Sequence, residues 1–231
     1  MSKPIIIIGK GPSSRPVKKS NKYDIATVNN TIWLAPEPTF AFFNDVELFY
    51  LCKKEDFNKV KTIVCPSYLH SHWAKLEGLC KNDETHFYEL NELFPGWFDH
   101  ISFSPYELHS GDNFRPEEKE RINQGGYPAP SLDRWPGSTG GTAAGWLSKY
   151  TEYRDFILMG CDPEGGYNSI FKGAGHKDGV KGFNGQGTDE QPSHLYQENY
   201  NIITNFITSY GGRARHINEV SIEEQKDLGL L

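Results

Sequence analysis

Four consecutive isoleucines, Ile5 to Ile8, stand between Pro4 and Gly9. A short run of β-branched residues that is apolar on both faces is typical of a central strand in a parallel sheet, not of an edge strand. The glycine that follows indicates a tight turn where the strand ends. This run therefore favours a sheet that is covered on both faces.

Further short apolar segments predict more strands, separated by segments long enough for helices. We expect these strands at residues 24–28, 39–43, 61–65 and 154–160, a helix at 145–150 after a flexible turn at 137–144, and an amphipathic helix from Ser193 onward. Strands that alternate with helices indicate an α/β fold with a mostly parallel sheet and right-handed crossovers. Residues 82–134 are expected to form an irregular insertion, and the glycine-rich segment at about 171–192 a lid.

Composition limits the classes of protein that the chain can belong to. Its 231 residues suit one domain spanning 1–231, and an aromatic content of 13% can supply a core. The net charge of −6 comes without any long basic block, and no stretch approaches the roughly 18 apolar residues of a membrane span. Four cysteines without C-x-x-C spacing indicate reduced thiols. We therefore expect a soluble protein of the cytoplasm.

Small and amide residues follow several of the predicted strands. They are Gly9-Lys10-Gly11, Asn29-Asn30, Asn44 and Ser67. The carboxyl ends of parallel strands meet at one edge of a sheet, where ligands of open α/β proteins bind. These residues therefore predict a site for a ligand of nucleotide size.

None of these segments is specific by itself. The segment Gly9 to Ser14 is neither a G-x-G-x-x-G sequence nor a P-loop, and it also suits an ordinary turn between strand and helix. Asparagine is a common loop residue. The segment Ser138-Thr139-Gly140 offers hydroxyl and amide donors for a phosphate, or equally a loop that caps a helix.

One histidine has a setting that suits catalysis. His194 stands just after the predicted lid, at the start of a predicted helix, and neutral imidazole can serve as a general base. A surface or capping role fits the same position. The chain contains no H-E-x-x-H, G-x-S-x-G or D-x-D sequence. This favours chemistry without a metal or other cofactor.

Taken in order, these segments resemble those of the bacterial lipooligosaccharide sialyltransferases. The matching residues are Gly9-Lys10-Gly11-Pro12-Ser13, Asn29 or Asn30, Asn44, Ser138-Thr139-Gly140, Gly160-Cys161-Asp162 and His194. The series covers most of the chain, with a poor match in the middle third. The resemblance implies one Rossmann-like domain that transfers a sugar from a nucleotide donor, with inversion and without a metal.

The resemblance also implies roles for single residues. His194 would be the general base, and Tyr167 would support the leaving phosphate. Donor-binding residues would be Gly9, Lys10, Gly11, Ser13, Asn29, Asn30, Asn44, Ser138, Thr139, Gly140, Gly160 and Asp162. Within this set, Asn30 and Asn44 would contact the nucleotide, Thr139 and Gly140 the phosphate or the sugar carboxylate, and Gly160 and Asp162 the base and ribose.

Two departures leave the donor open. Lys10 stands where the family has asparagine, and its cation suits a diphosphate as well as a monophosphate. Glu164 lies near the position of the family's second tyrosine. CMP-sialic acid is therefore not assumed as the donor.

The acceptor is expected to be a hydroxyl group away from membranes, because the chain has no basic amphipathic anchor. A glycan fits, and so, by analogy, does hydroxymethylcytosine in bacteriophage DNA, which would place the protein in the host cytoplasm. The basic residues that would contact the DNA phosphates also fit scattered solubilising charges; they are Lys18, Lys19, Lys53, Lys54, Arg115, Arg121 and Arg134. A non-catalytic nucleotide-binding module and a nucleotide-sugar hydrolase are the alternative functions. The sequence carries no signal for an oligomeric state.

Overall fold

A computed structural model describes residues 3–70, 78, 84–106, 138–166, 168–171 and 193–231. Most of the predicted lid and the second half of the predicted insertion lie outside these residues, and so does Tyr167.

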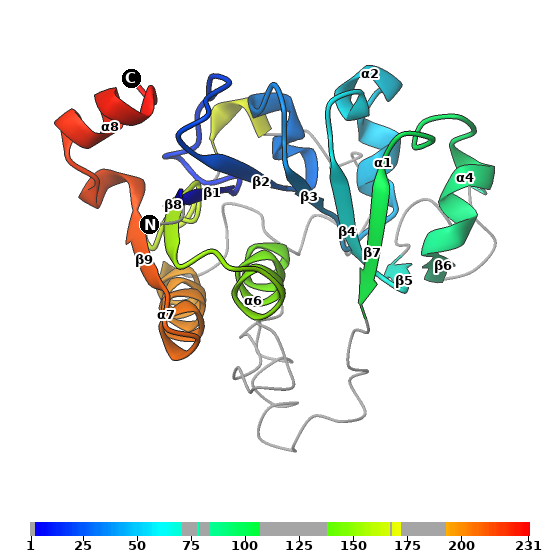
Figure 1. Cartoon of the computed structure of the whole chain (residues 1–231). Coiled ribbons are helices and arrows are strands. Elements are labelled where there is room, and N and C mark those ends of the chain that lie inside the picture. Colours follow the sequence, from blue (N-terminus) through cyan, green and yellow to red (C-terminus); the bar gives the residue numbers. More distant parts are fainter. Residues whose placement is uncertain (1–2, 71–77, 79–83, 107–137, 167, 172–192) are drawn as a thin grey trace, which may run out of the picture.

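The described residues form a seven-stranded sheet with helices on both faces (Figure 1). Its strands are β1 (Ile5–Ile8), β2 (Asp24–Val28), β3 (Phe40–Phe42), β4 (Thr62–Pro66), β7 (Ser102–Tyr106), β8 (Asp155–Met159) and β9 (Arg213–His216). They lie in the order β7-β4-β3-β2-β1-β8-β9, and every neighbouring pair is parallel. A separate antiparallel pair joins β5 (Tyr68–His70) to β6 (Glu84–His86). The predicted α/β fold with a parallel sheet is confirmed.

The isoleucine run forms an interior strand of the sheet, between β2 and β8, as predicted. All four side chains of β1 are fully buried. Ile5 and Ile7 pack on one face with residues of α6 (Thr139–Tyr150) and α7 (Ser193–Ser209). Ile6 and Ile8 pack on the opposite face. Full burial of one such side chain contributes about 1.5–3 kcal/mol, so this strand is a main source of stability.

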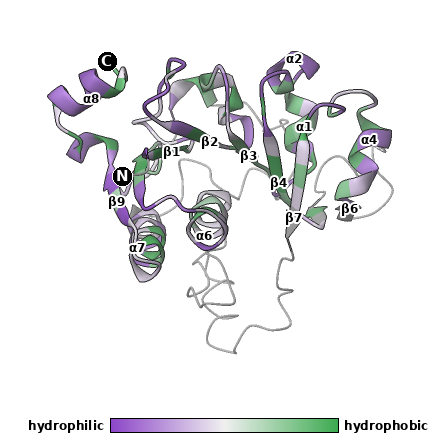
Figure 2. Ribbon diagram, viewed as in Figure 1, coloured by the Kyte–Doolittle hydropathy of each residue, from purple (hydrophilic) through white to green (hydrophobic). Residues whose placement is uncertain are grey.

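The other helices cover the second face of the sheet. They are η1 (Asn29–Leu34), α1 (Glu47–Leu51), α2 (Lys54–Phe57), η2 (Phe87–Glu89), α4 (Leu90–Leu93), η4 (Ser169–Phe171), η5 (Ile217–Glu219) and α8 (Ile222–Leu228). Aromatic side chains from this layer, among them Phe49, Phe57 and Phe98, form a core over β3 and β4. Figure 2 shows α8 as largely hydrophilic, as expected of a short surface helix.

The helix before β8 begins earlier than the sequence predicts. Residues 139–144, expected within a flexible turn, form the first turns of α6, and Ser138 caps the helix by accepting the N–H of Gly141 at 3.0 Å. Gly141, Ala143 and Ala144 are buried. Their small size lets the helix lie close to the sheet, and this packing outweighs the low helix propensity of glycine.

The outermost strands of the sheet, β7 and β9, were not predicted. β7 lies inside the segment that was expected to be irregular, and its sequence SFSPY contains a proline. β9 has the sequence RARH, with two arginines. Each of these strands has a neighbour on one side within the described sheet. Proline and charged residues are tolerated at edges, so edge strands lack the apolar run of central strands.

A polar cluster at the amino edge of the sheet provides a test of stability. The carboxylate of Asp24 pairs with Lys3 at 2.9 Å and accepts hydrogen bonds from the hydroxyl groups of Tyr153 and Thr39. Burial acts to raise the pKa of Asp24, but the hydrogen bonds from Lys3 and Tyr153 outweigh it and hold the pKa below its usual range. The ionised form is therefore stabilised by folding.

We expect Asp24→Asn to lower the free energy of unfolding at pH 7 by about 1–3 kcal/mol. Because the folded-state pKa is depressed, the contribution of Asp24 is complete above its unfolded pKa of roughly 4 and disappears as the pH falls through the folded-state value. Urea unfolding at pH 7 and pH 3 measures this difference, with the exposed residue Asp99 changed to Asn as the control. If the wild type and Asp24→Asn differ in unfolding free energy by the same amount at both pH values, ionised Asp24 has no such role.

Candidate functional site at the carboxyl edge of the sheet

The order of the strands places a switch point between β1 and β8. From β1 the chain adds β2, β3, β4 and β7 on one side, and it then returns to add β8 and β9 on the other side (Figure 1). In open α/β sheets ligands bind outside the carboxyl ends of the strands at such a point. The residues that follow β1, β2, β3 and β8 therefore define the candidate site.

Two glycines bring the turns after β1 and β8 into contact. A Cβ atom on Gly9 would lie 2.4 Å from the carbonyl oxygen of Gly160, and one on Gly160 would lie 2.2 Å from the carbonyl oxygen of Gly9. Gly160 also has a φ of 70°, which L-residues with side chains disfavour. Both positions therefore require glycine for the packing of the two turns.

The backbone N–H groups of the turn after β1 are largely used inside the protein. Gly9 donates to the carbonyl oxygen of Met159 at 2.7 Å, and Gly11 donates to that of Gly160 at 2.8 Å. Ser13 donates to Asp162, and Ser14 donates to Gly11 at 3.0 Å. An anion cradle built on the Gly11 amide would need one of these bonds to open. What the turn offers to a ligand is instead the side chain of Lys10.

Lys10 is partly buried as a residue, and its ammonium group is the poorly solvated part. Burial lowers the pKa of its ammonium group to about 8, although the negative charge of Asp45 acts to raise it. Its carbonyl oxygen accepts the N–H of Asn168 at 2.8 Å, which fixes the backbone at this residue. A bound anion would compensate the desolvated ammonium group and raise its pKa.

The two asparagines after β2 differ in their surroundings. Asn29 has a φ of 57°, a left-handed conformation that asparagine tolerates better than most residues, and its Nδ2 donates to the hydroxyl of Thr139 at 3.4 Å. Asn30 is fully buried, and neither end of its amide has a hydrogen-bond partner among the described residues. Buried amides normally have partners, so Asn30 is suited to hydrogen-bond a ligand. Asn44, after β3, is also buried.

The first turn of α6 lies beside the turn after β1. Cys161 lies between these two segments. If Gly9 carried a Cβ, that atom would lie 3.1 Å from Sγ of Cys161, and a Cβ on Gly140 would lie 3.8 Å from the same sulfur. The positive end of the α6 dipole, at Thr139 and Gly140, therefore adjoins the switch point and favours an anionic ligand there. Burial raises the pKa of Cys161 to about 12, so this thiol is not a nucleophile at neutral pH.

Asp162, predicted to line the base and ribose pocket, is engaged with other residues of the protein. Its carboxylate accepts the N–H of Ser13 at 3.1 Å and lies 3.2 Å from Nε2 of His216. Burial acts to raise the pKa of Asp162, but hydrogen bonds from His216 and Ser13 outweigh it and lower the pKa. The side chain has an exposed fraction of 7%. Its partners make Asp162 a residue that fixes the turns of the site.

Ser13, His216 and Asp162 do not form a catalytic triad. Nδ1 of His216 accepts the N–H of Asn218 at 3.3 Å, so Nε2 carries the proton in the neutral ring. Both the Ser13 hydroxyl, at 3.3 Å, and the Asp162 carboxylate face this Nε2. In a triad the carboxylate binds Nδ1 and leaves Nε2 free to take the serine proton. The geometry therefore does not support a serine nucleophile.

The start of α7 lies next to the loop that follows β8. The ring of Tyr196 packs on Gly165, where a Cβ would be 2.2 Å from the ring, and Asn199 accepts the hydroxyl of Ser138 at 3.0 Å. His194 belongs to the same first turns of α7, while its side chain lies outside the described residues, as does all of Tyr167. The proposed catalytic roles of these two residues remain predictions.

Sequence reasoning missed three residues at this edge. Tyr196 and Tyr200 share one face of α7 through their i, i+4 spacing, and this spacing was a signal that the sequence contained. Tyr200 lies edge-on to His216 with ring centroids 6.0 Å apart, and burial raises its pKa to about 12. His216 gave no signal, because it ends a strand that the sequence did not reveal.

The described residues contain no group of three or more histidine, cysteine, aspartate or glutamate side chains that is arranged to hold a metal ion. No helix in the described ranges is long and apolar enough to cross a membrane.

The fold and the site define a Rossmann-like α/β protein with a candidate ligand site at the switch point of a parallel sheet. Comparisons of the chain with protein-family models, with curated proteins and with solved structures found no match. What the site can do is therefore inferred from the residues of this chain.

Proposed function

We propose that this protein is an inverting, metal-independent glycosyltransferase that moves a sugar from a nucleotide-sugar donor to a hydroxyl acceptor, either a glycan or a modified DNA base. The observation that carries the proposal is that three groups suited to an anionic, polar ligand belong to segments at the carboxyl edge of the sheet: a desolvated ammonium group after β1, a fully buried amide after β2 without a partner among the described residues, and the N-terminus of α6, which Thr139 joins to Asn29. Lys10, Asn30 and the first turn of α6 together suit a ligand with both phosphate and polar groups.

In this proposal His194 accepts the proton of the acceptor hydroxyl while the oxygen attacks the anomeric carbon opposite the nucleotide. The bond from that carbon to the phosphate oxygen breaks, and negative charge gathers on the departing phosphate. Lys10 and the positive end of α6 would stabilise this charge. General-base catalysis typically contributes about 10²- to 10⁴-fold, and one donor to a developing oxyanion contributes about 3–4 kcal/mol.

The test is to incubate the protein with nucleotide sugars based on CMP, UDP and GDP and to follow nucleotide release with and without hydroxyl acceptors. Release that depends on an acceptor supports the glycosyltransferase. Release that acceptors do not accelerate would instead indicate a hydrolase. Binding without release would indicate a nucleotide-binding module, and neither binding nor release would contradict the site itself.

The lysine gives a prediction for the binding step. We expect Lys10→Met to weaken binding of a nucleoside diphosphate by about 10- to 100-fold at pH 7, because a charge-assisted contact of about 1.5–3 kcal/mol is lost. The charged form of Lys10 prevails below its pKa of about 8, so wild-type affinity should fall as the pH rises through that value. The Lys10→Met variant should not show this fall. Calorimetric titration between pH 6.5 and 9.5 measures both effects.

Two further variants serve as controls for this prediction. Lys10→Arg keeps a positive charge at all these pH values, so it should retain more affinity than Lys10→Met and lose the dependence on pH. Lys18→Met removes an exposed lysine outside the turn of residues 9–14, and this variant should bind as the wild type does. Equal affinity of Lys10→Met and the wild type would show that Lys10 does not contact the ligand.

A further inference from the structure

A buried polar cluster joins three strand ends behind the candidate site. It consists of Ser13 after β1, Asp162 after β8, and His216 at the end of β9. We infer that Asp162 and His216 are positioning residues, which hold the turn of residues 9–14 in the shape that presents Lys10 to the ligand. This inference rests on the proposed function, because it assigns to the cluster a task in binding the nucleotide.

The carboxylate of Asp162 is the centre of the cluster. Its two oxygens lie 3.2 and 3.1 Å from the backbone nitrogen of Ser13, and Oδ1 lies 3.2 Å from Nε2 of His216. The hydroxyl of Ser13 also bonds this carboxylate, and its oxygen accepts the N–H of Gly160 at 2.7 Å. The side chains of Asp162 and His216 each have an exposed fraction of 7%, so water competes little for these bonds.

His216 is held in the orientation that this role requires. Its Nδ1 accepts the N–H of Asn218, which leaves the proton on Nε2 and directs it toward Asp162. Its backbone N–H donates to Oε2 of Glu219 at 2.9 Å, and the ring of Tyr200 lies edge-on against the imidazole. The imidazole is therefore a fixed donor that reaches the turn after β1 from the far side of β8.

The turn needs such an anchor because two of its residues are glycines. Gly9 and Gly11 give the chain conformational freedom, and a Cβ on Gly11 would lie 2.2 Å from Oδ2 of Asp162. The Ser14 hydroxyl bonds the carbonyl oxygen of Gly11, so Ser13 and Ser14 tie the far end of the turn. Lys10 lies between the two glycines. The bond from Asn168 holds its carbonyl oxygen, and its direction depends both on this bond and on the anchored end of the turn.

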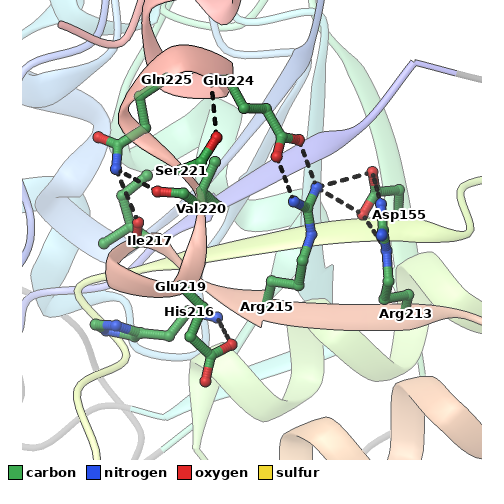
Figure 3. A network of polar contacts seen from close by, with 10 residues as sticks. All are labelled: Asp155, Arg213, Arg215, His216, Ile217, Glu219, Val220, Ser221, Glu224 and Gln225. Atoms are coloured by element: carbon green, nitrogen blue, oxygen red, sulfur yellow. Dashed lines mark hydrogen bonds and ion pairs between the residues drawn. The ribbon is translucent and has the colours of Figure 1, made fainter.

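The same strand that carries His216 offers a matched control. Arg215 pairs with Asp155 at 3.1 Å and with Glu224 at 2.7 Å, and these pairs join β9 to β8 and α8 without touching the turn (Figure 3). In Figure 3 the imidazole of His216 lies well apart from this ion-pair network. A change at Arg215 thus loosens the C-terminal segment, whereas a change at His216 removes the link to the turn.

The experiment combines four variants of the full chain with two measurements. His216→Phe keeps a ring and removes the donor, His216→Gln restores an N–H near the position of Nε2, Asp162→Asn weakens the acceptor, and Arg215→Ala is the control. The first measurement is the amide hydrogen exchange of Ser13 and Gly160. The second is the affinity for CMP, UDP and GDP, each measured separately by calorimetry.

We expect His216→Phe and Asp162→Asn to speed exchange at Ser13 and Gly160 by at least tenfold relative to the strand amides of β1, and to weaken binding of the preferred nucleotide by at least tenfold. His216→Gln should recover most of both losses, and Arg215→Ala should change neither, even if it lowers the melting temperature as much. If His216→Phe folds poorly, the exchange rates and nucleotide affinities of Asp162→Asn and His216→Gln still test whether the cluster holds the turn.

Other results would overturn the inference. If His216→Phe and Asp162→Asn have the same amide exchange rates and the same nucleotide affinity as the wild type, the turn does not depend on the cluster. Losses of equal size in Arg215→Ala would show general destabilisation of the C-terminal segment. If the wild type binds none of the three nucleotides, the proposed function fails and the task in nucleotide binding fails with it. Hydrogen exchange at Ser13 and Gly160 then still shows whether the cluster anchors the turn, so the two failures are distinguishable.

Discussion

His194→Ala is expected to slow sugar transfer by about 10²- to 10⁴-fold, because the acceptor hydroxyl would lose its general base. The affinity for the donor nucleotide should change little, since the imidazole acts on the acceptor. The loss would therefore fall on kcat, with little change in the donor KM. Steady-state kinetics with the preferred donor and acceptor measure both quantities, and calorimetry measures nucleotide affinity independently.

Gln197→Ala is the control for this prediction. Gln197 is an exposed residue of α7, one turn after His194, and its removal tests for general effects on the helix. The control variant should transfer sugar at the wild-type rate. Full activity in His194→Ala would refute the assignment of the base, and a tenfold loss of nucleotide affinity would point to a binding role instead.

Gly160→Ala is expected to have the largest effect on stability. The added Cβ would lie 2.2 Å from the carbonyl oxygen of Gly9 and 2.8 Å from the Cβ of Ser14, and the residue has a φ of 70°. The backbone conformation costs about 1–2 kcal/mol for a residue with a side chain, and the overlap in a packed interior adds about 1–3 kcal/mol. At roughly 2–4 °C per kcal/mol for a chain of this size, we expect the melting temperature to fall by about 5–15 °C.

A second glycine separates the two causes. Gly211 has a φ of 74°, but a Cβ there would meet nothing within 4 Å. Gly211→Ala should therefore lose only the conformational part, about 1–2 kcal/mol. Thermal unfolding of the two variants under identical conditions measures the difference. Equal shifts would mean that the contact between the turns after β1 and β8 contributes nothing to stability.

The central strands could be predicted because burial on both faces demands apolar residues at every position. β1 and β2 have the predicted bounds, and β3, β4 and β8 lie within two residues of theirs. β7 and β9 could not be predicted, because an edge strand of this sheet accepts the proline of SFSPY and the arginines of RARH. The first turns of α6 were missed because a glycine-rich sequence by itself favours a turn. Packing of the small residues against the sheet stabilises the helix there.

The candidate site divides in a similar way. The residues that follow β1, β2 and β3 were found because each stands directly after a recognisable strand. Tertiary structure alone revealed that the Gly11 amide and the Asp162 carboxylate bond other residues of the protein, and that Asn30 has no partner among the described residues. The partner of Asp162 is His216, which is 54 positions away and belongs to a strand without a sequence signal.

The local structure of this protein follows from its amino-acid sequence alone: the segments that become central strands, and the residues that stand at their carboxyl ends. Hydrophobic periodicity and turn residues act over a few neighbouring positions, so these patterns can be recognised in the sequence. Packing between distant segments settles which side of β1 receives β8, how far the ammonium group of Lys10 is desolvated, and which donors reach Asp162. Those outcomes depend on contacts between distant segments, and the energy of such contacts is defined only once the sheet has brought the segments together.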